Sequence, residues 1–205
     1  MAFSNYTQLQ SAIADFIDRI DISSVIPDFI ELAETGMNRE IRHWRMEKRA
    51  TAALDTQYSS LPDDFLEPIR MSLNTPNTNT LEMVNAFQIS NLRAQNLNTT
   101  GRPVNFAISD GSIEVFPTPD ASYTLELLYY EKISPLSVVS SNWVLSNHPD
   151  AYLYGSLIHS APYLADDGRI QTWAALYQKA INDINSESER SKTSGSGRRM
   201  KIRSY

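Results

Sequence analysis

Residues 6–20 read YTQLQSAIADFIDRI. Apolar side chains recur there every three or four positions, which is the period of one face of a helix. Thr7 and Gln10 have the three-residue spacing of a capping box, which marks a helix start. The stretch predicts a first helix whose buried stripe is formed by Leu9, Ile13, Phe16, Ile17 and Ile20.

A second helix is predicted after the short link of residues 22–24. Pro27 suits a first helical turn, and Asp28 complements the positive end of the helix. The apolar stripe predicts a helix to about residue 42 that packs against the first as a hairpin. Its members are Ile26, Ile30, Ala33, Met37 and Ile41.

The pattern changes between residues 46 and 131 to short alternating runs broken by Asp, Asn, Pro and Gly, which is typical of strands and turns. The pair Asp110-Gly111 predicts a hairpin between residues 104–109 and 112–116. Asn85 and Gln88 predict a short helix over residues 85–95. Strand faces are predicted for Ile69, Met71 and Leu73, and for Tyr123, Leu125, Leu127 and Tyr129.

Two helices are predicted in the C-terminal third. The first starts near residue 147 and is expected to kink or end at Pro162. The second starts near residue 171, fades over residues 186–190 and is followed by a flexible linker over residues 191–197. The predicted fold class is therefore α+β and mainly α: a helical bundle formed by the N- and C-terminal helices, with a β-rich insertion and an extended C-terminal tail. The expected boundaries are 1–45, 46–131, 132–190 and 191–205.

Composition excludes several classes of protein. The 205 residues include no cysteine, which removes disulfides and thiolate chemistry, and no apolar run long enough to cross a membrane. Net charge is −6, and all 24 acidic residues lie before residue 191. An acidic body repels phosphates, whereas a basic tail can reach an anionic surface. The tail's basic residues are Lys192, Arg198, Arg199, Lys201 and Arg203.

Candidate chemistry is sparse. The chain shows no glycine-rich phosphate loop, and His43, His148 and His159 lack a metal-ligand spacing. The pairs Asp63-Asp64 and Asp166-Asp167 are interpreted as turn and cap residues. Ser156 and His159 share a helix face but lack an elbow, an oxyanion donor and a third member. We therefore expect no catalytic, cofactor-binding or metal-binding residues and no cofactor, and classify the chain as a non-enzyme.

A basic cluster brackets Trp44 and is the strongest candidate contact surface of the body. It is expected to contact a partner or DNA, although a helix end that favours cations and a solvent-facing strand would explain about half of it. Its members are Arg39, Arg42, Arg45, Lys48 and Arg49, with His43 among them.

The C-terminal aromatic residues are interpreted mainly as core, with burial by another chain as the alternative for part of the set. They are Tyr152, Tyr154, Tyr163, Trp173 and Tyr177.

Several stretches together, over about residues 5–190, resemble tailed-phage adaptor proteins of the head-to-tail connector. They are YTQLQSAIADF (6–16), IPDFIELAE (26–34), LPDDFLE (61–67), YTLELLYY (123–130), DAYLYG (150–155) and APYL (161–164).

This resemblance implies a structural virion protein, made in the host cytoplasm and placed at the head–tail junction. It would form a ring of 12 copies beneath the portal protein, extend the DNA channel for genome packaging and DNA ejection, and carry tail or nozzle proteins. Genomic DNA would pass through without sequence-specific binding, and no membrane is involved. Wall hydrolase activity has been credited to some family members, but its motif is absent here.

The basic tail is our candidate for docking to an acidic groove of the portal. Arg198, Arg199, Lys201 and Arg203 would supply charge, and apolar anchors would be Met200, Ile202 and Tyr205. Two alternatives stay open: a peptidoglycan hydrolase that uses Asp or Glu, and a nucleic-acid-binding module that uses the basic cluster and the tail.

Overall fold

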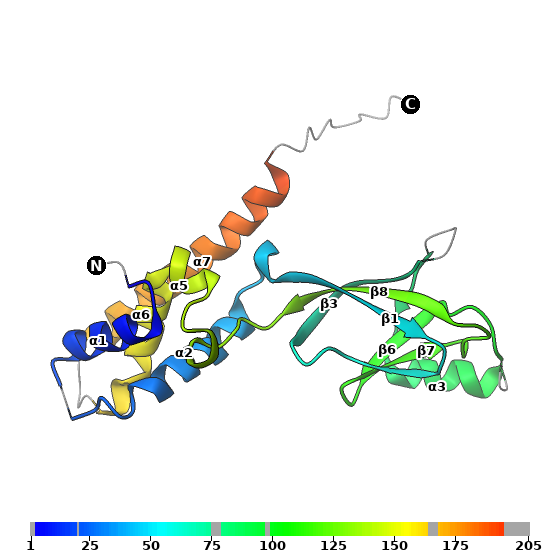
Figure 1. Cartoon of the computed structure of the whole chain (residues 1–205), viewed down its shortest axis with the longest axis horizontal. Coiled ribbons are helices and arrows are strands. Elements are labelled where there is room, and N and C mark those ends of the chain that lie inside the picture. The colour runs from blue at the N-terminus through cyan, green and yellow to red at the C-terminus, as the bar shows by residue number, and fades with distance from the viewer. Residues whose placement is uncertain (1–2, 20, 75–78, 97–98, 164–167, 195–205) are drawn as a thin grey trace. The chain divides into compact units, whose positions relative to one another are not determined.

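The chain divides into two compact units in a computed structural model that describes residues 3–19, 21–74, 79–96, 99–163 and 168–194. The helical unit is Met1–Arg45 together with Ile133–Tyr205, and the β unit is Met46–Lys132. Figure 1 shows strands and the helix α3 in the β unit. The predicted α+β class is confirmed, whereas the bundle arrangement of the N- and C-terminal helices stays a prediction. In the described residues no helix is long and apolar enough to span a membrane.

The helical unit is organised around α6, which contacts α1, α2, α5 and α7. Two 3-10 turns, η1 (Trp44–Met46) and η2 (Ala161–Tyr163), follow α2 and α6 in the chain. The helices are α1 (Tyr6–Ile17), α2 (Ile26–Glu40), α4 (Leu136–Val139), α5 (Trp143–Asn147), α6 (Pro149–His159) and α7 (Arg169–Thr193).

Helix α1 forms where predicted, but its cap differs from the prediction. The N-cap is Asn5, whose side chain accepts a hydrogen bond of 2.9 Å from the backbone N–H of Gln8. Gln8 in turn accepts from the backbone N–H of Ser4 at 2.8 Å, so Thr7 and Gln10 do not form the capping box. Phe16 was predicted to be core and is 40% exposed.

Helices α2, α6 and α7 meet at small residues. A Cβ atom added to Gly155 of α6 would lie 3.1 Å from the Tyr177 ring of α7 and 3.2 Å from the Cβ of Ala33 of α2. One added to Gly36 of α2 would lie 3.4 Å from the Tyr177 hydroxyl. The glycines therefore make room for Tyr177 between α2 and α6.

The C-terminal helices differ from the prediction in their bounds. Helix α6 ends at His159, before Pro162, as predicted. Helix α7 runs through Thr193, so residues 191–193 belong to a helix instead of a linker. The predicted break at Asp166-Asp167 lies outside the described residues. The short helices α4 and α5 were not predicted.

The β unit contains two four-stranded sheets. The first has the order β1 (Glu47–Leu54), β8 (Tyr123–Glu131), β3 (Phe65–Leu73), β4 (Asn79–Thr80). The second has the order β2 (Tyr58–Ser60), β7 (Ser112–Phe116), β6 (Asn105–Ser109), β5 (Glu82–Met83). Only the β5–β6 pair is parallel among these strands.

Both sheets contribute to one apolar core. Strand β8 buries Leu125, Leu127 and Tyr129, the face that the alternation predicted. In β3, register shifts on either side of Pro68 disturb the predicted alternation, and Ile69 is exposed. The buried members of the core are Leu54, Met71, Leu73, Leu81, Phe106, Ile113, Val115, Leu125, Leu127 and Tyr129.

Two local predictions in the β unit are confirmed. Asp110 and Gly111 join β6 to β7 with φ angles of 50° and 67°, the positive values that a tight primed turn requires. Helix α3 (Ala86–Gln95) starts with the predicted capping box of Asn85 and Gln88.

Candidate assembly surfaces

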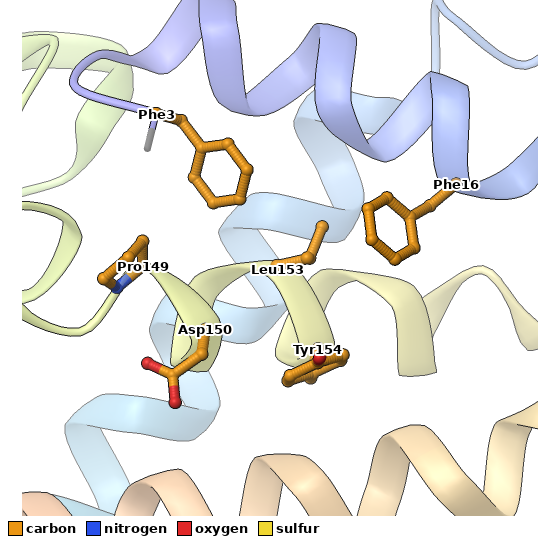
Figure 2. Close-up of a pocket in the computed structure, with 6 residues that line it drawn as sticks. All are labelled: Phe3, Phe16, Pro149, Asp150, Leu153 and Tyr154. Carbon is orange, nitrogen blue, oxygen red and sulfur yellow. The ribbon is translucent and has the colours of Figure 1, made fainter. Parts of the chain in front are cut away.

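The helical unit has a solvent-open hollow between α1 and α6, which we call the α1/α6 hollow. Its volume is about 380 Å³, and Figure 2 shows the Phe3 and Phe16 rings pointing towards Leu153 of α6. The exposed carboxylate of Asp150 points away from these rings. The lining residues are Phe3, Phe16, Pro149, Asp150, Leu153 and Tyr154. The hollow is mainly apolar and has one charged group at its rim.

A buried hydrogen-bond network centres on Glu34 of α2 and Tyr152 of α6. Glu34 of α2 is 7% exposed and accepts hydrogen bonds from the Tyr152 hydroxyl of α6 at 3.1 Å and the backbone N–H of Leu136 at 2.8 Å. The Asn142 side chain donates to the same hydroxyl at 2.6 Å. Burial raises the pKa of Glu34, and its two hydrogen bonds oppose that shift only in part. This network ties α6 to α2 and α5.

The sequence did not reveal the hollow. Phe16 was assigned to the core, and Pro149 and Asp150 lie where a helix was predicted to start, near residue 147. Tyr154 was placed in the aromatic set, of which Tyr152 and Trp173 are buried and Tyr163 is exposed. No local pattern links Phe3 with Leu153, because residues so far apart are brought together only by the packing of α1 on α6.

The predicted basic cluster is divided between the two units. Arg39 is exposed in the last turn of α2, where the negative end of the helix dipole stabilises a positive charge. The Arg42 guanidinium donates to the carbonyl oxygens of Asn38 and Ile41 at 2.9 and 2.7 Å. It therefore supplies hydrogen bonds to backbone carbonyls at the C-terminal end of α2. Arg45 lies over the Trp44 ring, 5.0 Å from its centre.

Lys48 and Arg49 belong to β1 in the β unit. Lys48 forms ion pairs with Asp64 and, at 3.1 Å, with Glu131. Arg49 lies 3.9 Å from Glu126 and is largely exposed. The ion pairs of Lys48 are those expected of a side chain on a solvent-facing strand. Contact with a partner or with DNA stays a prediction for the whole basic cluster.

A histidine pair meets around Trp143, although the two residues are distant in sequence. The His43 ring is fully buried and stacks on Trp143 with 4.8 Å between ring centres. The rings of Trp143 and His148 are perpendicular, with 6.2 Å between their centres, and His148 lies 3.5 Å from Glu187. Burial lowers the pKa of His43, so its neutral form is favoured. In the described residues no group of three His, Cys, Asp or Glu side chains could hold a metal ion.

Of the pair Asp63-Asp64, Asp64 is bound by a cation and a hydroxyl, which fits a structural role. Asp64 accepts hydrogen bonds from Lys48 and from the Tyr129 hydroxyl, the latter at 2.8 Å. Burial acts to raise the pKa of Asp64, but these two hydrogen bonds, together with the charge of Lys48 and a backbone hydrogen bond, outweigh it and lower the pKa. The pair Asp166-Asp167 lies outside the described residues. The buried Ser156 hydroxyl has no hydrogen-bond partner among the described residues, so it is not bonded to His159.

The candidate docking residues of the tail, Arg198, Arg199, Met200, Lys201, Ile202, Arg203 and Tyr205, lie outside the described part of the chain.

Comparison with known families covers both units. A comparison with curated proteins finds no match. A family model described as SU10 adaptor protein matches residues 4–200, nearly the full length of the chain. The match runs through both the helical unit and the β unit, so a single shared motif does not account for it. The chain therefore belongs to the SU10 adaptor protein family, a family of phage head-to-tail adaptors.

Proposed function

We propose that the chain is a subunit of a ring that attaches beneath the portal, extends the DNA channel and carries tail or nozzle proteins. The number of copies in the ring, 12, is what the family resemblance implies.

 The observation that carries this proposal is the family match over residues 4–200, which covers both units. The adaptor role in the phage particle follows from the family, and the ring, its position and its partners are the proposal.

The division into two units suits such a role. A ring needs a heterologous interface, in which one face of each subunit meets a different face of the next. A helical unit and a β unit offer two chemically different faces on one chain. Closure of the ring then depends only on the rotation between neighbouring copies.

Charge supports the same role. All 24 acidic residues precede residue 191, so the body is acidic. Like charge prevents tight contacts with DNA phosphates, and DNA can then slide past the subunits without binding to them. The basic residues after residue 191 give the tail the opposite sign, which favours an acidic groove on the portal.

The test is the mass of the purified chain, measured by light scattering after size exclusion, alone and mixed with the portal protein of the same phage. We expect a complex of defined stoichiometry that contains both proteins. Two proteins that elute separately at micromolar concentration would contradict portal attachment.

The tail assignment is tested by deleting residues 195–205, which leaves all of α7 in place. We expect weaker portal binding with an unchanged circular dichroism spectrum. Two variants separate the tail's charge from its apolar anchors: one replaces Arg198, Arg199, Lys201 and Arg203 by Gln, and the other replaces Met200, Ile202 and Tyr205 by Ser. Unchanged binding after the deletion would overturn the assignment.

A further inference from the structure

The outer face of α3 is uncharged. Ile89 is the buried residue of this helix and packs with Ala107 and Phe116. A fifth of the whole chain is charged, yet no exposed residue of α3 is. The exposed side chains include Phe87, Gln88, Ser90, Asn91, Ala94 and Gln95.

The one charged residue of α3 is held against the sheet. Arg93 donates to Glu114 and to the Thr118 hydroxyl, each at 3.0 Å, and its side chain is only 24% exposed. The positive charge of Arg93 is therefore paired within the β unit, and the outer face of α3 carries no charge. Interface cores are depleted of charge in the same way and enriched in aromatic residues.

Phe87 stands on this uncharged face and is 74% exposed. A single exposed apolar residue is ordinary in a folded protein. Here it is combined with the uncharged helix face and with Met83, which is also exposed, on the strand that leads into α3. The combination is typical of a surface that another protein covers.

The α1/α6 hollow is large enough and apolar enough to receive an aromatic side chain. Its volume of about 380 Å³ exceeds the roughly 150 Å³ of a cavity that holds a benzene molecule. The Phe16 ring is 40% exposed and can pack against a third ring, and the Phe3 ring, which is 8% exposed, forms part of the wall of the hollow. Phe87 lies in the first turn of α3, at the positive end of the helix, and Asp150 supplies a negative charge at the rim of the hollow.

We propose that Phe87 of one copy inserts into the α1/α6 hollow of a second copy. The protrusion and the hollow lie on different units of the chain, so the contact is heterologous and can propagate from copy to copy until a ring closes. The inference rests on the proposed function, because it requires that copies of this chain meet in an assembly.

The absence of cysteine allows a direct test by crosslinking. Ser90→Cys lies one turn after Phe87 on the exposed face, and Asp150→Cys lies at the rim of the hollow, so both variants keep the Phe87 ring. The two single-cysteine chains, tagged to differ in mass, are mixed with the portal and treated with a short bismaleimide. We expect a crosslink between the two different chains. In the control, Asp150→Cys is replaced by Val138→Cys, at a position of α4 whose native side chain is 79% exposed.

Phe87→Ala, introduced beside Ser90→Cys, should remove the crosslink and weaken association between copies by about 10- to 100-fold. Gln95→Ala, on the same helix face, is the matched variant and should leave both unchanged. If the chain assembles on the portal but the crosslink is absent, equals the control or survives Phe87→Ala, the inference is overturned while the proposed function stands. A crosslink from Ser90→Cys to a different protein also overturns it. If the chain does not assemble with the portal at all, the proposed function fails and the inference falls with it.

Discussion

Asn185 of α7 donates a hydrogen bond of 3.0 Å to the carbonyl oxygen of Glu40, the last residue of α2. The oxygen of the same side chain accepts from the backbone N–H of Arg42 at 2.9 Å. One side chain thus satisfies a carbonyl and an N–H where the chain leaves α2 for the β unit. The two hydrogen bonds hold the C-terminal end of α2 against α7.

Asn185→Ala should lower the free energy of unfolding by about 1–2 kcal/mol, because it removes both hydrogen bonds, of which the one from the Arg42 N–H is partly buried. Urea denaturation followed by circular dichroism measures the change. Asn182→Ala, an exposed position one turn earlier in α7, is the control and should change stability by less than about 0.5 kcal/mol. Equal stability of the two variants would show that water replaces the Asn185 contacts.

Gly155→Ala sets two opposing effects against each other. Alanine favours a helix over glycine by about 1 kcal/mol. Its Cβ would lie 3.1 Å from the ring of Tyr177 and 3.2 Å from Ala33, and overpacking costs about 1–3 kcal/mol. We expect a net loss of about 1 kcal/mol in a thermal or urea denaturation experiment.

Gly168→Ala is the control for this substitution, because no atom of the described residues lies within 4 Å of the added Cβ. It should be neutral or slightly stabilising. A gain in stability for Gly155→Ala would mean that Tyr177 moves aside at no cost, and the close packing of α2, α6 and α7 would not be a constraint.

Local patterns in the sequence predicted much of the fold. The period of residues 6–20 gave α1, the pair Asp110-Gly111 gave the β6–β7 turn, and Asn85 with Gln88 gave the start of α3. Each of these signals lies within a few residues, where backbone preference and side-chain capping act directly. Such elements are predictable because no distant contact has to be known.

The elements that were missed depend on distant contacts or on short segments. Helices α4 and α5 have four and five residues, too few to show a helical period. Ile69 leaves the core because register shifts flank Pro68, and alternation alone cannot locate these. The α1/α6 hollow and the contacts of Asn185 join segments far apart in the chain, so no spacing within the sequence indicates them.

Arg93→Met should destabilise the β unit strongly. Its guanidinium is paired with Glu114, whose side chain is 12% exposed, and removing one partner of a buried pair costs about 3–5 kcal/mol. Among the described residues, the Glu114 carboxylate would keep only its 2.9 Å hydrogen bond from Gln57. Intrinsic fluorescence during urea unfolding and far-UV circular dichroism measure the loss.

The double variant Arg93→Met with Glu114→Gln should recover part of that loss, since it leaves no unpaired buried charge. Arg70→Met is the control, because the ion pair of Arg70 with Glu126 is exposed and worth at most about 1 kcal/mol. A double variant that is less stable than Arg93→Met alone would contradict the ion-pair explanation.

The buried carboxyl of Glu34 should make stability depend on pH. Burial raises its pKa in the folded state above the unfolded value of 4.5. Below that value both states are protonated and the stabilisation is fully present; it is lost as pH rises through the higher folded pKa. Glu34→Gln keeps an acceptor oxygen for Tyr152 and Leu136 but cannot ionise. The unfolding free energy of the native chain minus that of Glu34→Gln should therefore fall with rising pH, measured by urea denaturation from about pH 4 to pH 8.

Glu31→Gln, at an exposed position of α2, controls for the change in net charge. A difference that stays constant over the whole range would show that Glu34 titrates alike in both states.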